Sequence, residues 1–184
     1  MLDNMLQMVC HPDTPPKTVI GVEVAAILSA GGELWLRYYV DGILDNMETL
    51  SPVEPLRTDG LWQTTCFEAF LRAQNDAGYY EYNFAPSGAW AAYQFEGYRD
   101  DMRELELEAA PETFLDASDT HLAAEVTISI AANLLSGPIE LNLTAVIEET
   151  DGTKSYWALA HPAGQPDFHH RDCFALKLLP PVAS

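Results

Sequence analysis

Hydrophobic and polar residues alternate in short stretches along this chain, and a period of two residues is the spacing of β-strands. From Thr18 to Ala30 and from Glu33 to Val40, β-branched and aromatic residues lie between the turn pairs Gly31-Gly32 and Asp41-Gly42. This pattern predicts two antiparallel strands joined in a hairpin.

The same alternation, interrupted by turn residues, predicts a series of further strands. They cover residues 66–71, 79–84, 90–95, 103–109, 121–130, 139–148, 155–160 and 173–178. Residues 131–135 are expected to form a single helical turn. About ten short strands with little helix predict an all-β fold, an antiparallel two-sheet β-sandwich of a jelly-roll-like type.

A chain of 184 residues has the length of one ordinary domain, and no internal repeat or low-complexity tract divides it. Residues 1–16 are mixed in pattern and end in Asp13-Thr-Pro-Pro, so they predict a loose N-terminal arm. Residues 17–184 are then expected to form a single domain. Their apolar content is sufficient for a packed core, because 48% of the whole chain is hydrophobic.

The formal net charge of −19 argues against binding to nucleic acid or to an anionic membrane, because both require clusters of Lys and Arg. The first residues lack the basic and apolar segments of an export signal, and no apolar run is long enough to cross a bilayer. We therefore expect a cytoplasmic location. Cys10, Cys66 and Cys173 are odd in number and far apart, which indicates reduced thiols. The sequence does not determine the oligomeric state.

Trp62 lies in a loop just before the strand predicted at residues 66–71. A loop at the edge of a sandwich can expose an indole ring, which then stacks on the apolar C–H face of a sugar. The other interpretation is that Trp62 caps the core, since tryptophan is usually largely buried.

Polar residues also interrupt two of the predicted apolar strands. Glu68 shares a strand face with Cys66 and Phe70, and a carboxyl group among apolar neighbours needs a hydrogen-bond partner or a wet cavity. Glu81 and Asn83 interrupt the following strand in the same way. Ligand contact and a purely structural hydrogen bond remain the two interpretations of Glu68.

Three of the five histidines, His161, His169 and His170, gather near the end of the chain beside two Asp and one Arg. The adjacent His169 and His170 point to opposite faces of an extended segment, and no third ligand stands at helical spacing. The zinc signal is therefore weak, and a loop that lines a binding cleft is the favoured interpretation.

Catalytic sequence motifs are absent, including the nucleophile elbow, the phosphate-binding loop and the zinc-protease motif. A pair of carboxylates could hydrolyse a glycosidic bond, but the distance between them decides that chemistry, and a sequence does not give it. We therefore expect a non-enzymatic domain without a cofactor.

Three segments give the chain a resemblance to DOMON-like domains and to the related family-nine carbohydrate-binding modules. They are WQTTCFEAFL from Trp62, YYEYNFAPSGAW from Tyr79 and YWALAHPAGQPDFHHRDCFALKL from Tyr156. The resemblance covers most of the chain and implies an antiparallel β-sandwich.

The resemblance also implies a sugar site. In these modules a Trp precedes a strand that carries a Glu six positions later, which corresponds to Trp62 and Glu68. A polar residue on the following strand corresponds to Asn83, where the modules often have Arg, and a second stacking Trp corresponds to Phe168. With His169 as a further polar contact, the expected ligand is a carbohydrate or sugar-like small molecule held in an aromatic cleft.

Other DOMON domains bind haem through a Met and a His, which leaves a haem- or metal-binding domain as an alternative. The candidates in this chain are Met47, Met102, His121 and the pair His169-His170, and none of them matches a haem pattern. A protein-interaction domain is a further alternative.

Overall fold

Two antiparallel sheets build this protein, and the computed structural model describes them over residues 4–43 and 55–180. The five-stranded sheet has the order β1 (Leu6–Gln7), β3 (Val19–Leu28), β4 (Glu33–Gly42), β10 (His121–Ser129) and β9 (Glu112–Ala117). The eight-stranded sheet has the order β2 (Val9–Cys10), β12 (Lys154–Ala158), β11 (Ile139–Glu148), β5 (Cys66–Ala73), β6 (Tyr79–Phe84), β7 (Trp90–Phe95) and β8 (Arg103–Glu104), with β13 (Leu176–Leu178) paired to β11. Short 3₁₀ helices occur at η2 (Leu61–Gln63), η3 (Ala132–Ser136) and η4 (Arg171–Cys173).

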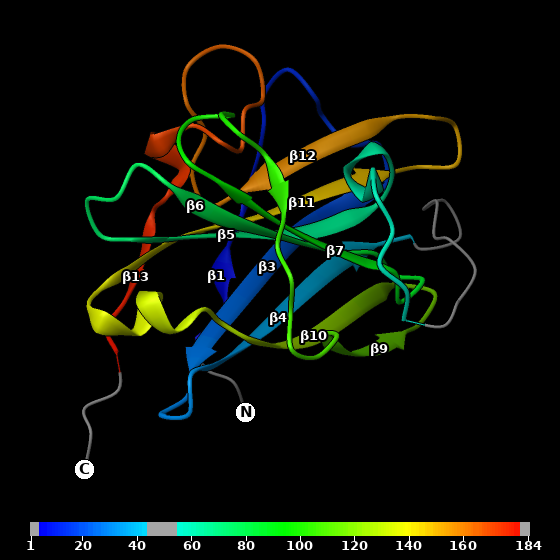
Figure 1. The fold of residues 1–184 in the computed structure, drawn as a ribbon. Coiled ribbons are helices and arrows are strands. Elements are labelled where there is room, and N and C mark those ends of the chain that lie inside the picture. The colour runs from blue at the N-terminus through cyan, green and yellow to red at the C-terminus, as the bar shows by residue number, and fades with distance from the viewer. Residues whose placement is uncertain (1–3, 44–54, 181–184) are drawn as a thin grey trace.

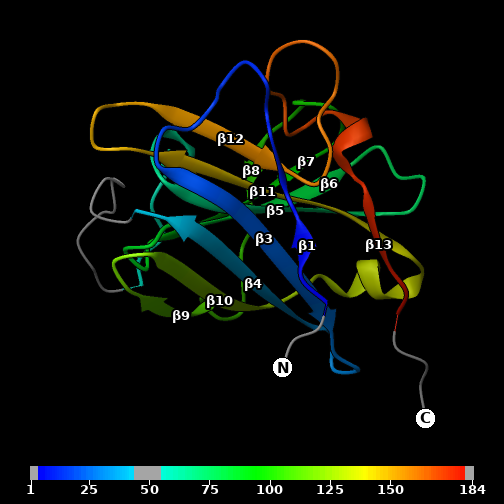
Figure 2. The same cartoon turned by 180° about the vertical axis from the view of Figure 1, so that it is seen from behind.

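The two sheets stack as layers. β3, β4, β9 and β10 lie in one layer, and β5, β6, β11 and β12 lie in the other (Figure 1). The same two layers are visible from behind in Figure 2. The predicted all-β, antiparallel two-sheet sandwich is confirmed, as is the short helical turn after β10.

The hairpin of β3 and β4 shows why strands form here. In β4, Leu34, Leu36, Tyr38 and Val40 are buried, while the residues between them are partly exposed. Alternation therefore turns one apolar face of the strand toward the other sheet. In the turn, Gly32 has a φ of +82°, a left-handed conformation that glycine adopts without steric cost.

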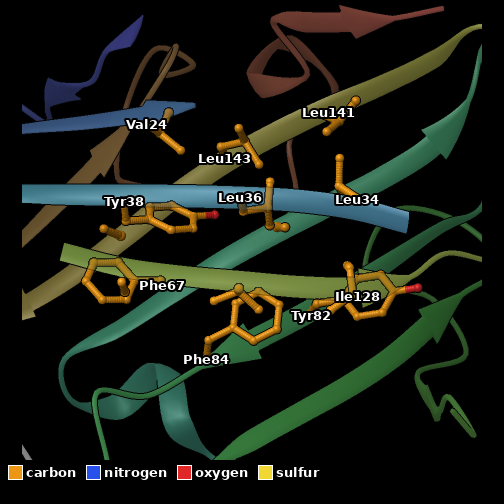
Figure 3. Close-up of a cluster of buried hydrophobic side chains, with 14 of the residues drawn as sticks. Val24, Leu34, Leu36, Tyr38, Phe67, Tyr82, Phe84, Ile128, Leu141 and Leu143 are labelled. Carbon is orange, nitrogen blue, oxygen red and sulfur yellow. The ribbon is translucent and has the colours of Figure 1, made fainter. Parts of the chain in front are cut away.

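The main core fills the space between the sheets (Figure 3). There the ring of Tyr38 stacks on Phe67 of β5, with 4.8 Å between the ring centroids. The Tyr38 hydroxyl donates a hydrogen bond of 2.7 Å to the backbone carbonyl of Glu68. This bond crosses from one sheet to the other and ties the core to the strand that carries Glu68.

The eight-stranded sheet is covered on its outer face as well. In β5, Phe67, Ala69 and Leu71 face the main core, whereas Cys66 and Phe70 belong to a second hydrophobic cluster on the outer face. The cover consists of η2, the segment after β7 and the segment between β12 and β13, which lie on the side away from the five-stranded sheet (Figure 1). β5 is therefore buried on both faces.

The N-terminal segment differs from the loose arm that its sequence predicts. β1 pairs with β3, and β2 pairs with β12, so residues within 1–16 add an edge strand to each sheet. The backbone N–H of His11 also donates a hydrogen bond of 2.8 Å to the carbonyl of Tyr156. Strands of two residues are too short to produce a detectable alternation, which explains the wrong prediction.

Two further stretches differ from the pattern. The strand expected at residues 103–109 is only the two-residue β8, although Leu105 and Leu107 still pack against the core. β9 has no clear sequence signal, because it is an edge strand whose residues are mostly exposed.

We expect Tyr38→Phe to lower the free energy of unfolding by about 1–2 kcal/mol, because it deletes a buried hydrogen bond between the sheets. Tyr39→Phe is the matched control, since Tyr39 is partly exposed on the outer face of the same strand, where it stacks on His121. Its effect should stay within about 0.5 kcal/mol. Equilibrium unfolding in urea measures both values, and equal losses would contradict the role given to the Tyr38 hydroxyl.

Candidate ligand-binding cleft

The polar floor of the cleft follows from strand register on the outer face of the eight-stranded sheet. Glu68 of β5 lies opposite Asn83 of β6 and opposite Thr144 of β11. Two residues further along β5, Phe70 lies opposite Glu81 of β6. Both carboxyl side chains are buried, with Glu68 2% and Glu81 4% exposed.

Short hydrogen bonds fix these polar side chains. The Thr144 hydroxyl donates to Oε2 of Glu68 over 2.9 Å, and the Asn83 amide donates to Oε1 of Glu81 over 2.8 Å. The thiol of Cys66 lies 3.8 Å from the Asn83 carbonyl oxygen. Each carboxyl group therefore has one oxygen engaged, that of Glu68 by the neighbouring strand β11 and that of Glu81 by Asn83 on its own strand β6.

Aromatic rings from the covering segments form the walls above this floor. Trp62 is part of η2 and is partly buried, with its ring edge-to-face to Tyr93 at 6.0 Å between centroids. Phe168 lies in the segment between β12 and β13 and packs against Tyr156 at 5.9 Å. Gly60 caps the N-terminus of η2 and has a φ of +75°, a left-handed conformation that turns the chain just before Leu61 and Trp62.

Floor and walls enclose a cavity of about 360 Å³. This volume lies in the range of small-molecule sites, about 300–1,000 Å³. Its lining is a mixture of aromatic and charged side chains: Trp62, Glu68, Phe70, Glu81, Phe95, Arg99, Met102, Val146, Tyr156, Pro166, Phe168 and His169.

Hydrogen bonds from the sheet and from a neighbouring segment hold the cover in place. The side-chain amide of Asn142 on β11 donates to the backbone carbonyl of Phe168 over 2.8 Å. Asp167 accepts a hydrogen bond of 2.5 Å from the Tyr98 hydroxyl and one of 2.8 Å from the Arg99 guanidinium. The segment after β7 and the segment after β12 are thus joined at Asp167.

His169 belongs to the segment after β12 and packs on the floor, with 5.1 Å between the centroids of its ring and that of Phe70. The Tyr79 hydroxyl accepts a hydrogen bond from the backbone N–H of Arg99, and it lies 2.7 Å from Nδ1 of His169. Burial, and then the charge of Arg99, lower the pKa of His169 to about 4, so the ring is neutral at pH 7. The network therefore assigns Nδ1 as the acceptor for Tyr79 and places the ring proton on Nε2, 3.8 Å from Oε2 of Glu81.

Burial disfavours the ionised form of both carboxyl groups. Burial, and then the charge of Glu81, raise the pKa of Glu68 from 4.5 to about 8. Burial likewise raises the pKa of Glu81 to about 7, although the hydrogen bond from Asn83 opposes the shift. At neutral pH both carboxyl groups are therefore protonated to a large extent.

The structure places four of the five proposed ligand contacts, Trp62, Glu68, Phe168 and His169, in the lining of this single cavity. The fifth, Asn83, is fully buried in the floor and reaches the cavity only through its hydrogen bond to Glu81. Phe168 is 8% exposed, so it is a buried wall, whereas Trp62 retains an exposed part of its ring.

Sequence reasoning did not identify several residues of the lining. Arg99 and Tyr156 carry no recognisable signal, because Arg99 lies in an irregular segment and Tyr156 resembles any half-buried strand residue. Glu81 was detectable, since it interrupts an apolar strand as Glu68 does. Alternation alone places both carboxyl groups on one face once the register of β5 and β6 is known.

The alternative metal and haem candidates are dispersed. His121 stacks on Tyr39 of the five-stranded sheet, and His170 accepts a hydrogen bond from the backbone N–H of Asp172 at the start of η4. Met47 lies outside the described residues. Within residues 4–43 and 55–180, no group of three or more His, Cys, Asp and Glu side chains is placed to hold a metal ion.

In the part of the chain that the structure describes, no helix is long and apolar enough to cross a membrane. No family model and no curated protein sequence matches the chain.

Solved structures with a similar fold are found nevertheless. A candidate carbohydrate-binding protein from Bacteroides uniformis ATCC 8492 superimposes with a TM-score of 0.72, over 96% of this chain and 84% of that chain, at 17% sequence identity. A family 9 carbohydrate-binding module from Caldicellulosiruptor kristjanssonii, in complex with cellotriose, gives a TM-score of 0.51 over 88% of this chain and 74% of that chain, at 11% identity. The chain therefore has a β-sandwich fold that is similar to those of these two proteins.

Proposed function

We propose that this domain binds a carbohydrate in the cleft on the outer face of the eight-stranded sheet and does not convert it chemically. The observation that carries the proposal is the composition of one cavity of about 360 Å³. Aromatic rings, including Trp62 and Tyr156, line it together with two buried carboxyl groups and a guanidinium group.

This combination suits the two surfaces of a pyranose. Its C–H face is apolar and packs on an aromatic ring, and its rim of hydroxyl groups needs hydrogen-bond donors and acceptors. Trp62 and Tyr156 are partly exposed aromatic residues available for stacking. Glu68 and Glu81 offer acceptors, and Arg99 offers donors. A purely apolar cleft of the same size would have no polar groups to select a sugar over a hydrocarbon.

The structural comparisons support the proposal at the level of fold. One similar protein is described as a candidate carbohydrate-binding protein, and the other is a carbohydrate-binding module with cellotriose bound. Function has to be argued from the site itself, because one fold hosts many functions. We also propose that the domain is related to DOMON-like domains, on the basis of the sequence segments around Trp62, Tyr79 and Tyr156.

Hydrolysis is the alternative that a pair of carboxyl groups raises. Glu68 and Glu81 project from neighbouring strands of one floor, on the same face of the sheet. Glycosidases place their two carboxyl groups on either side of the bond that they cleave. Turnover of an aryl glycoside that is abolished in Glu68→Gln would contradict this proposal.

Haem does not fit this cleft. Met102 and His169 both line the cavity, but Nδ1 of His169 is engaged by Tyr79 and Nε2 faces Glu81. Ligation through Nε2 would place the porphyrin against the buried carboxyl groups of Glu68 and Glu81, which its apolar face cannot hydrogen-bond. We expect no Soret band when the purified protein is mixed with haemin.

We expect Trp62→Ala to weaken sugar binding by about 10–100-fold, because removing an aromatic contact of this size costs about 1.5–3 kcal/mol. A thermal-shift screen with mono- and oligosaccharides, starting with cello-oligosaccharides, identifies the ligand, and calorimetry then gives its dissociation constant. The melting temperature of the free variant should change little, since Trp62 is partly exposed.

Trp35→Ala is the matched control for this variant. Trp35 is also partly buried, but it projects from the outer face of the five-stranded sheet. Its removal should leave the dissociation constant unchanged. Equal loss of binding in the two variants, or a collapse of stability in Trp62→Ala, would refute the stacking role of Trp62.

The buried pair of Glu68 and Glu81 lowers the free energy of unfolding at pH values above the ordinary carboxyl pKa of 4.5. Each group has a folded pKa raised above the ordinary 4.5, so the native state binds more protons than the unfolded state between that value and the raised pKa. The free energy of unfolding therefore falls as the pH rises through this window. Groups that lower stability while lining a cavity are typical of binding sites, where function opposes stability.

We expect Glu81→Gln to be more stable than the wild type by on the order of 1–3 kcal/mol at about pH 8, with the difference shrinking toward zero at about pH 5. The amide cannot ionise, so it avoids the cost of a buried charge. Urea unfolding at a series of pH values measures the difference. Glu112→Gln, at an exposed position, is the control for the general effect of removing one surface acid. If the difference in unfolding free energy between Glu81→Gln and the wild type does not change with pH, the buried charge of Glu81 is not its cause.

A further inference from the structure

Each carboxyl group of the acid pair keeps one oxygen that a ligand in the cleft can reach. Oε2 of Glu68 and Oε1 of Glu81 accept hydrogen bonds from Thr144 and Asn83. The second oxygen of each group, Oε1 of Glu68 and Oε2 of Glu81, accepts none from the described residues. Both side chains line the cavity and are more than nine-tenths buried, so these oxygens are available to a ligand that occupies it.

The charge of Arg99 opposes the rise in pKa of both carboxyl groups, but no Arg or Lys among the described residues forms a salt bridge with either of them. Arg99 is the positive group that lines the cavity, and its guanidinium is already paired with Asp167 at 2.8 Å, with its side chain 52% exposed. His169 is neutral at pH 7 and stands too far from Glu81 for a hydrogen bond. The other titratable groups on this face whose pKa the pair affects are neutral at pH 7: Cys66, Tyr79 and Tyr93.

We propose that the cleft selects a carbohydrate that carries a protonated amine, an amino sugar, and that Glu68 and Glu81 bind its ammonium group. This inference rests on the carbohydrate-binding function proposed above and specifies its ligand class. An ammonium group has three donors, and each carboxyl group has one oxygen left to accept from it. Aromatic walls such as Trp62 and Tyr156 add a favourable environment for a cation, because the faces of their rings are negative.

An organic cation fits this site better than a metal ion. Calcium takes six to eight oxygen ligands, and the floor offers two carboxyl groups surrounded by aromatic rings. No cluster of three or more metal-binding side chains occurs among the residues described. An amine supplies hydrogen-bond donors and a charge while the rest of the sugar fills the apolar part of the cavity.

Binding of the amine should also release protons. At neutral pH the coupled pair holds protons that the positive charge displaces, because a nearby cation favours the ionised form of a carboxyl group. A neutral sugar does not have this effect. The number of protons released distinguishes a salt bridge to the pair from an ordinary hydroxyl contact.

The test compares glucosamine, glucose and N-acetylglucosamine, together with sugars that carry the amine at other ring positions, each against its neutral parent. Titration calorimetry at about pH 7 in two buffers of different ionisation enthalpy gives the affinity and the proton release. We expect at least one amino sugar to bind about 10–100-fold more tightly than its parent, as for charge-assisted hydrogen bonds, with protons released. The preference should fall to within about twofold in Glu81→Gln and in Glu68→Gln.

Controls separate this inference from the proposed function. The exposed Glu112→Gln should keep the preference for the amine, which excludes attraction by the general negative charge of the surface. Far-ultraviolet circular dichroism and thermal melting confirm that each variant is folded. If neutral sugars bind as tightly as the amines, the inference is overturned and the carbohydrate function stands.

Two other outcomes also overturn the inference. If no sugar of either kind binds, the proposed function fails together with it. If calcium alone binds and this binding is lost in the two Gln variants, the pair is a site for an inorganic cation and not for an amine.

Discussion

Burial of β5 on both faces is the constraint on which the rest of the structure depends. One face of the strand packs into the main core through Phe67, Ala69 and Leu71, as alternation requires. The other face cannot reach bulk water, because the segments after β7 and β12 cover it. Polar residues on that face must therefore find partners within the protein or open onto a cavity, and Glu68 does both.

The same constraint links the core to the cleft. The Tyr38 hydroxyl reaches across the core to the backbone of Glu68, while the side chain of Glu68 lies on the opposite face of β5. The floor is thus held from below by the opposite sheet and laterally by Thr144. Sites on strands that are fixed on both sides keep their geometry better than sites on loops.

The cover depends on a different and weaker kind of interaction. Two of its parts, the segment after β7 and the segment after β12, meet at Asp167. There Tyr98 and Arg99 donate hydrogen bonds that are largely exposed to solvent. Such exposed pairs contribute about 0–1 kcal/mol. The buried bond from Asn142 to the carbonyl of Phe168 is the stronger anchor, since it ties the aromatic wall directly to the sheet. The floor is therefore rigid, and the rim formed by Tyr98 and Arg99 is the part of the site most able to adapt.

The sequence was sufficient for the fold class and for the principal polar residues. Long alternating strands such as β4 and β11 determine the sandwich, and the interruption of an apolar strand marks Glu68. Two-residue strands such as β1 and β2 could not be found, because they are too short for a periodic signal. Arg99 could not be found either, since its approach to the cleft depends on the conformation of an irregular segment and on Asp167, which is distant in sequence.

The overall charge and the local charge of the site act on a ligand in the same direction. A net charge of −19 repels anionic sugars from the surface before they reach the cleft, and it raises the local concentration of cations. This long-range effect is screened within about 8–10 Å at physiological salt, whereas Glu68 and Glu81 act inside a buried cavity where screening is weak. The surface can therefore accelerate the arrival of a cation, but only the buried pair can decide which one remains bound. Because each carboxyl group already has one oxygen fixed by a hydrogen bond from the sheet, its free oxygen is oriented before the ligand arrives, and little ordering is needed on binding.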